Sequence, residues 1–119
     1  MENGLRAKLA GIYDCYIINP LVRKPMFTDD GACVWHQYVV RVDNRDAFRA
    51  YLLEHGVETA VHYATPPYRQ TCYSEYADID MPVSDEIART CVSLMPWKLR
   101  KLSTATRTDK FGKGLSEMT

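Results

Sequence analysis

Apolar and polar residues alternate along the stretch from Val34 to Val42, and this period of two is typical of a half-buried strand. Every second residue of the stretch points the same way, and His36 is the one polar residue among them. We therefore predict a strand over these residues, with His36 in a core-facing position as a buried histidine whose polar atoms have partners.

A helix is predicted to follow this strand directly. A side-chain oxygen of Asp43 or Asn44 can accept hydrogen bonds at a helix start, and Gly56 can adopt the left-handed conformation that ends a helix. Val57 to Val61 is short, apolar and β-branched, which predicts a returning strand. Between the two caps, residues at helical spacing form one stripe that can lie on a sheet: Phe48, Tyr51, Leu52 and His55.

Two longer helices are predicted to flank this unit. The first begins near Asn3 and ends at Pro20, because proline disfavours the α conformation of the residue before it. The second begins at Ser84 and ends at Pro96, and Thr71–Tyr76 is a short helix or turn between them. The apolar stripe of the first helix comprises Leu5, Leu9, Ile12 and Tyr16. The stripe of the second comprises Ile87, Cys91 and Leu94.

These elements predict an α/β fold, a small mixed sheet with flanking helices, in one domain over residues 1–96. Residues 97–119 are basic, rich in Ser, Thr and Gly, and have no sustained period, which predicts a disordered tail. A truncated or altered gene end would explain such a tail, and a basic interaction arm is the alternative.

The charge balance points to neither nucleic acid nor membrane as a partner, since 15 basic residues stand against 15 acidic ones. No apolar run approaches the ~20 residues of a membrane span. The first residues lack the basic leader and apolar core of a signal peptide. We therefore expect a soluble, cytoplasmic protein.

The four cysteines are predicted to be reduced structural thiols. Cys15, Cys33, Cys72 and Cys91 lie far apart in the sequence, without the close ligand pairs of zinc sites, so no metal site is expected. Cys15 and Cys91 fall on the predicted helix stripes, where a thiol behaves as a small buried hydrophobe.

The loop HYATPPYRQ, which follows the second predicted strand, is the candidate binding site. Open α/β sheets tend to bind ligands at the carboxyl ends of their strands, and Pro66 and Pro67 stiffen the loop. His62 and Tyr63 are the leading candidates for a substrate contact. The alternative is structural, with His62 bonded to its own loop and Tyr63 packed on Tyr73.

Four segments, in order, resemble the small C-terminal domain of DegT/StrS-type sugar-nucleotide aminotransferases, which depend on pyridoxal phosphate (PLP). The segments are WHQYVVRV, EHGVET, HYATPPYRQ with TCYSEY after it, and MPVSDEIARTCVSL. Their doubled proline is similar to that of members acting on dTDP-linked 3-keto-6-deoxysugars. The resemblance implies the fold of the C-terminal domain of fold-type I PLP-dependent aminotransferases, and a role in making nucleotide-linked sugars for polysaccharides.

The resemblance also implies substrate-binding residues in the loop, and no catalytic or cofactor-binding residue in this chain. Arg69 and Gln70 are candidates for a nucleotide diphosphate, although a lone arginine is more often a solvated surface group. The loop departs from the family in two places, since Ala64 stands where proline is usual and Tyr68 where histidine is common. The implied substrate-binding residues are His62, Tyr63, Tyr68, Arg69 and Gln70.

A PLP enzyme needs a lysine for the Schiff base and donors for the cofactor phosphate. None of the six lysines resembles the family's cofactor lysine: Lys8, Lys24, Lys98, Lys101, Lys110 and Lys113. No cofactor is therefore expected in this chain; PLP is implied for the full-length family enzyme, and a nucleotide sugar is expected to bind only with the large domain. The sequence leaves open whether the chain is itself an enzyme. A non-catalytic binding or assembly module is the alternative, and a hydrolase using Cys72 and His62 is a further one.

In the family, the small domain packs against the large one. A free copy is therefore expected to present an apolar face, with the stripe of the first helix as the leading candidate. Such a face favours self-association as a homodimer.

Overall fold

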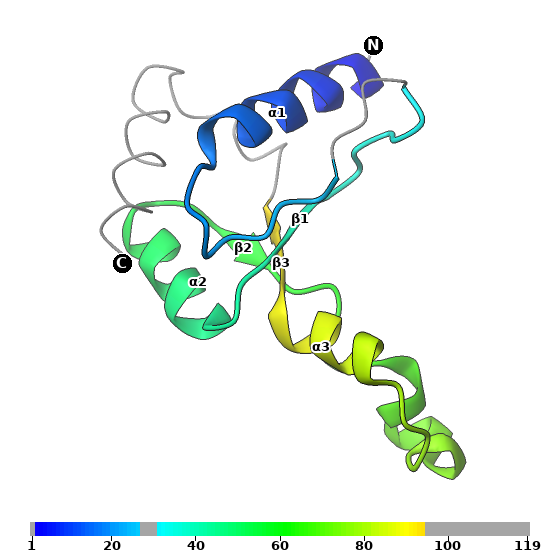
Figure 1. Cartoon of the computed structure of the whole chain (residues 1–119). Helices are drawn as coiled ribbons and strands as arrows, with labels where there is room; N and C mark the ends of the chain where they lie inside the picture. The colour runs from blue at the N-terminus through cyan, green and yellow to red at the C-terminus, as the bar shows by residue number, and fades with distance from the viewer. Residues whose placement is uncertain (1, 27–30, 95–119) are drawn as a thin grey trace.

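Helices and short strands alternate along the residues that the computed structural model describes, 2–26 and 31–94 (Figure 1). The α-helices are α1 (Glu2–Tyr16), α2 (Arg45–Glu54) and α3 (Pro82–Thr90). The strands are β1 (Tyr38–Arg41), β2 (Thr59–Ala60) and β3 (Cys91–Leu94). Two 3-10 helices, η1 (Pro67–Arg69) and η2 (Thr71–Tyr76), lie between β2 and α3. The predicted tail, residues 97–119, lies outside the described residues.

The sheet has the strand order β1-β3-β2, and both outer strands pair antiparallel with β3. Val40 lies opposite Val92, and Ala60 lies opposite Ser93. β1 and β2 therefore point the same way, and β3 occupies the position between them. The predicted α/β class is confirmed, and these three strands form an antiparallel sheet in place of the mixed one.

The central strand is the element that the sequence pattern misassigned. Cys91 and Leu94 were expected on a helix running to Pro96, but α3 ends at Thr90 and all four residues of β3 are buried. A strand buried on both faces shows no alternation, so a short apolar run fits helix and strand alike. As a strand, residues 91–94 provide hydrogen-bond partners for the backbone N–H and C=O groups of both β1 and β2, which do not pair with each other in the described sheet.

The first strand is shorter than predicted because the chain bends at Trp35. This residue has φ +50°, outside the extended region, and strand pairing begins only at Tyr38. The bend places the Trp35 side chain in the core, stacked on the Tyr38 ring at 5.6 Å between centroids. His36 is consequently exposed, so its prediction as a buried histidine is wrong. The returning strand, β2, is likewise shorter than the predicted Val57–Val61.

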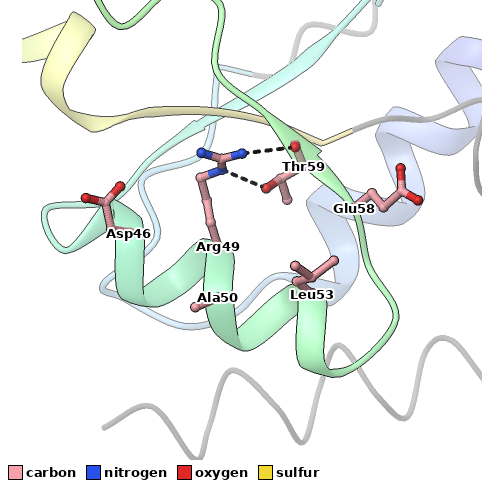
Figure 2. Close-up of a pocket in the computed structure, with 6 residues that line it drawn as sticks. All are labelled: Asp46, Arg49, Ala50, Leu53, Glu58 and Thr59. Atoms are coloured by element: carbon pink, nitrogen blue, oxygen red, sulfur yellow. Dashed lines mark hydrogen bonds between the residues drawn. The ribbon is translucent and has the colours of Figure 1, made fainter.

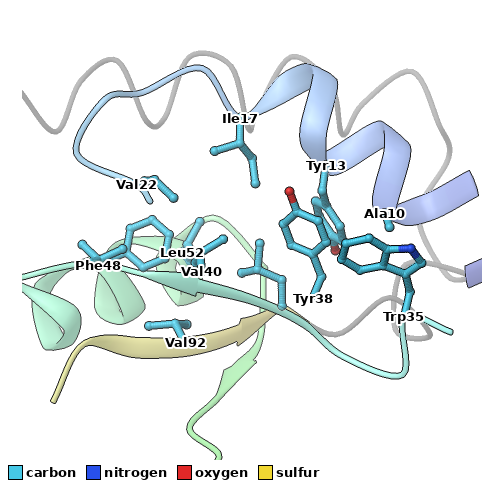
Figure 3. Packing of buried hydrophobic residues seen from close by; sticks show 12 residues of the cluster. Ala10, Tyr13, Ile17, Val22, Trp35, Tyr38, Val40, Phe48, Leu52 and Val92 are labelled. Carbon is cyan, nitrogen blue, oxygen red and sulfur yellow. The ribbon is translucent and has the colours of Figure 1, made fainter. Parts of the chain in front are cut away.

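One apolar cluster joins α1 and α2 to the sheet (Figure 3). Phe48 and Leu52 of α2 are buried in it, as the stripe of that helix predicts. His55 ends the helix with its Nδ1 2.8 Å from the carbonyl oxygen of Tyr51. The cluster comprises Ala10, Tyr13, Ile17, Val22, Trp35, Tyr38, Val40, Val42, Phe48, Leu52, Val92 and Leu94.

The first helix buries a different side from its most apolar stripe. Ala10 and Tyr13 face the core, as does Ile17 just after the helix, and the Tyr13 ring packs on Tyr38 with 5.1 Å between centroids. The predicted stripe faces outward, with Leu5 47%, Ile12 41% and Tyr16 48% exposed.

The cysteines differ from their predicted burial. Cys15, Cys33 and Cys72 are exposed, so the predicted burial of Cys15 is wrong. Cys91 is buried as predicted, but on a strand and not on a helix.

Candidate functional site

The predicted binding loop begins with an anchor to the central strand. His62 follows β2, and its Nδ1 shares a hydrogen bond of 2.9 Å with the Oγ of Ser93. Ser93 lies in β3 and is 1% exposed. His62 is thus tied to the middle of the sheet, which differs from the structural alternative of a bond within its own loop.

Tyr63 lies open to solvent, with 74% of its surface exposed. Its ring meets the His62 ring edge-on, with 5.4 Å between centroids and 85° between planes. The peptide bond between the two residues is cis. The ring contact of Tyr63 is therefore with its anchored neighbour, which differs from the structural alternative of packing on Tyr73.

Farther along the loop, three side chains meet at the first turn of α3. The Arg69 guanidinium donates from Nε to Asp85 Oδ1 at 2.8 Å and from Nη2 to Oδ2 at 2.7 Å. The Tyr68 hydroxyl donates to the same Oδ1. The Tyr68 ring also lies beside the guanidinium, whose central carbon is 5.4 Å from the ring centroid. We call Tyr68, Arg69 and Asp85 the loop clamp.

The loop clamp perturbs the ionisation of its charged members. The hydrogen bond from Arg69, followed by that from Tyr68, lowers the pKa of the Asp85 carboxyl to about 2. The hydrogen bond to Asp85, followed by that with Tyr68, raises the pKa of Arg69 above its already high ordinary value. Arg69 is therefore a paired cation, and its predicted contact with a diphosphate stays a prediction.

Gln70 and Cys72 complete the polar groups of this segment. Both are exposed, and the Cys72 thiol lies 4.0 Å from Gln70 Oε1. The described hydrogen bonds place His62 on Ser93 and the thiol near Gln70. They do not form the thiol–imidazole pair that a cysteine hydrolase requires.

Away from this loop, a hollow of about 400 Å³ lies between α2 and the chain entering β2 (Figure 2). Arg49 spans it, donating from Nε to Thr59 Oγ1 at 3.1 Å and from Nη2 to the Thr59 carbonyl at 3.4 Å. No predicted site residue lines it, and no sequence pattern singled it out. The lining residues are Asp46, Arg49, Ala50, Leu53, Glu58 and Thr59.

The described residues do not fit a PLP site. Lys8 is exposed on α1, and Lys24 donates to the carbonyl oxygen of Asp14 at 2.6 Å and pairs with its carboxylate at 3.3 Å. Neither lysine belongs to the loop that carries His62. Over residues 2–26 and 31–94, no group of three or more His, Cys, Asp or Glu side chains is placed to hold a metal ion. No helix in that part of the chain is long and apolar enough to cross a membrane.

Comparison with protein families gives a match over residues 5–107 to the DegT/DnrJ/EryC1/StrS aminotransferase family. The dTDP-3-amino-3,6-dideoxy-alpha-D-galactopyranose transaminase of Aneurinibacillus thermoaerophilus is 43% identical over 93 residues, which are 78% of this chain and 26% of that protein. The UDP-2-acetamido-2-deoxy-3-oxo-D-glucuronate aminotransferase of Pseudomonas aeruginosa is 36% identical over the same length, with the same coverage. The chain thus spans about a quarter of these curated relatives.

Solved structures give the same result for the fold. S. venezuelae DesV, in complex with a ketimine intermediate, superposes with a TM-score of 0.79 at 27% identity, covering 98% of this chain and 31% of that one. A DegT DnrJ EryC1 StrS aminotransferase from Brucella abortus superposes with a TM-score of 0.76, also at 27% identity and with the same coverage.

Proposed function

Because the chain belongs to the DegT/DnrJ/EryC1/StrS aminotransferase family, we propose that it is the small-domain part of an enzyme that aminates a nucleotide-linked keto-deoxysugar. Two relatives whose names contain nucleotide-linked deoxysugars, a dTDP-sugar transaminase and a UDP-sugar aminotransferase, match the chain over 78% of its length. The setting that the family implies is cytoplasmic synthesis of sugars for polysaccharides.

The observation that carries the proposal is the arrangement of His62 and Tyr63. The bond to Ser93 fixes His62 on the central strand, and the edge-on ring contact holds the exposed Tyr63 beside it. A polar group held in place loses little conformational entropy when a ligand binds. Tyr63 is therefore a prepared hydrogen-bonding group for a polar ligand such as a nucleotide sugar.

The chemical step belongs to the rest of the enzyme. PLP, when bound, supplies the electron sink for amino transfer. The described part of this chain offers neither a lysine in the loop nor a phosphate cradle, so its own contribution is to bind and orient the sugar nucleotide. The large domain of the family is the proposed source of the cofactor site.

A hybrid enzyme tests this division of labour. Residues 5–94 of this chain replace the matching segment of the Aneurinibacillus transaminase, and amino transfer is measured with that enzyme's own substrate. We expect transfer by the hybrid and none by the 119-residue chain alone. A hybrid that folds and binds PLP but transfers nothing contradicts the proposal and favours the alternative, a binding or assembly module with the same fold.

A further inference from the structure

The loop clamp lies where the chain has little other means of holding its shape. η1, η2 and α3 project together from the body of the molecule (Figure 1). Every residue from 71 to 80 is exposed, so apolar burial contributes little to the conformation of this segment. Arg69 and Asp85 are 16 residues apart and close the segment into a loop. A specific polar contact must therefore supply the order that the core supplies elsewhere.

We infer that Arg69 is a positioning residue, which fixes the binding loop on α3 through Asp85, and that it is not a ligand of the substrate's phosphates. This role deepens the proposed function and rests on it only for the expected effect on the kinetics of the enzyme. It also assigns a role to Tyr68, which stands where the family commonly has histidine.

The geometry of the ion pair supports this role. The planar guanidinium uses two parallel N–H groups on the two oxygens of Asp85, an arrangement that fixes direction as well as distance. The Tyr68 hydroxyl occupies a further acceptor position of the same carboxylate. Arg69 and Asp85 are 45% and 33% exposed, so solvent screens the pair only in part.

The same contacts make Arg69 a poor partner for a diphosphate. Asp85 occupies the edge of the guanidinium formed by Nε and Nη2, so a phosphate on that edge would have to displace the carboxylate. A phosphate on the remaining N–H groups would lie close to the same carboxylate, and the two negative groups would repel each other.

Hydrogen exchange in the 119-residue chain tests the clamp without any assay of function. Arg69→Lys keeps the positive charge but loses the two parallel N–H donors, and Asp85→Asn removes the negative charge of the acceptor. We expect about tenfold faster exchange of the Gln70 and Tyr73 amides in both variants, with exchange in the sheet unchanged. Arg89→Lys, at an exposed arginine in the last turn of α3, is the matched control and should leave these amides as they are.

A double-mutant cycle in the hybrid enzyme separates positioning from phosphate binding. For a positioning residue, Arg69→Gln and Asp85→Asn should each raise KM by about fivefold with little change in kcat, and the double variant should be no worse than either. A phosphate ligand predicts a loss in Arg69→Gln alone, with Asp85→Asn equal to or better than the unmodified hybrid.

Unchanged amide exchange in both single variants of the chain overturns the clamp, whatever the hybrid does. A hybrid that folds and binds PLP but transfers nothing contradicts the proposed function, and faster amide exchange in the Arg69→Lys and Asp85→Asn variants of the chain then still supports the clamp. The two failures are therefore distinguishable.

Discussion

The Asp85 carboxylate receives donors from both Tyr68 and Arg69, and the folded protein therefore favours its charged form. Asp85 also lies in the first turn of α3, where the helix dipole favours negative charge. The folding of the loop onto α3 is thus linked to the ionisation of one side chain. The helix predicted to begin at Ser84 begins at Pro82 in the structure, with Asp85 in its first turn, and no residue pattern linked this carboxylate to the loop.

This linkage predicts a loss of stability in acid. The pKa of Asp85 falls from an ordinary value of 3.8 to about 2 on folding, so its contribution is present above pH 3.8 and is lost as the pH falls toward 2. Urea unfolding of the chain and of Asp85→Asn, at steps across this range, measures it. We expect the difference in unfolding free energy between the two proteins to shrink as the pH falls. A difference that stays constant contradicts the linkage.

His62 and Tyr63 could be selected from the sequence because the signal is local, a strand end followed by two prolines. Their partners could not. Ser93 lies 31 residues from His62 along the chain, and Asp85 lies 16 residues from Arg69. Residue patterns report which face a side chain takes on its own element, and the contacts of a loop depend on how separate elements are brought together.

At the scale of elements, α2 was predicted well except for its cap, because Asn44 precedes the helix without a side-chain hydrogen bond, and β3 was predicted wrongly. Two separate signals predicted helix α2. One is its apolar stripe, in which Phe48 and Leu52 are buried, and the other is Gly56 just after its end, which adopts φ +78° as a helix-ending glycine should. The run at 91–94 is buried at all four positions, its one polar residue Ser93 included, so it shows no alternation that would separate a strand from a helix. Only the need of β1 and β2 for a common partner decides in favour of a strand.

The sheet itself gives a stability prediction. Val40 is fully buried in β1 opposite Val92, so Val40→Asp places a charge in the core without a partner. We expect the unfolding free energy to fall by more than about 3 kcal/mol, as measured by urea denaturation. Val34→Asp, at a site 55% exposed, is the control and should cost little. A Val40→Asp chain that unfolds cooperatively at the original midpoint would show that this strand is not buried.

At the scale of the whole molecule, the outward stripe of α1 is the feature without a described partner surface. Leu5, Ile12 and Tyr16 are each more than 40% exposed along one side of the helix. The charge distribution does not oppose a contact there between copies, since the predicted stripe itself is uncharged. We therefore keep the expectation that the isolated chain self-associates, most simply as a two-fold dimer.

Replacing Leu9 and Ile12 with Glu tests this expectation, because a charged stripe cannot pack on its own copy. Light scattering should find the unmodified chain as a dimer and the double variant as a folded monomer, with circular dichroism as the check on folding. Lys8→Glu, at an exposed position beside the stripe, is the control and should leave the dimer intact. An unmodified chain that stays monomeric at high concentration rules out this interface.

The most direct test of the central claim is the effect of Tyr63→Phe on the kcat/KM of the hybrid enzyme for its sugar nucleotide. The substitution removes one hydroxyl from an exposed ring and keeps the ring's contact with His62, so it alters binding without disturbing the anchor. We predict a loss of about 1–3 kcal/mol in transition-state stabilisation, the range for leaving a polar partner unpaired. Tyr73→Phe, at another exposed tyrosine, should leave the constant unchanged. An undiminished kcat/KM in Tyr63→Phe and also in His62→Ala would contradict the account and reduce the loop to scaffolding.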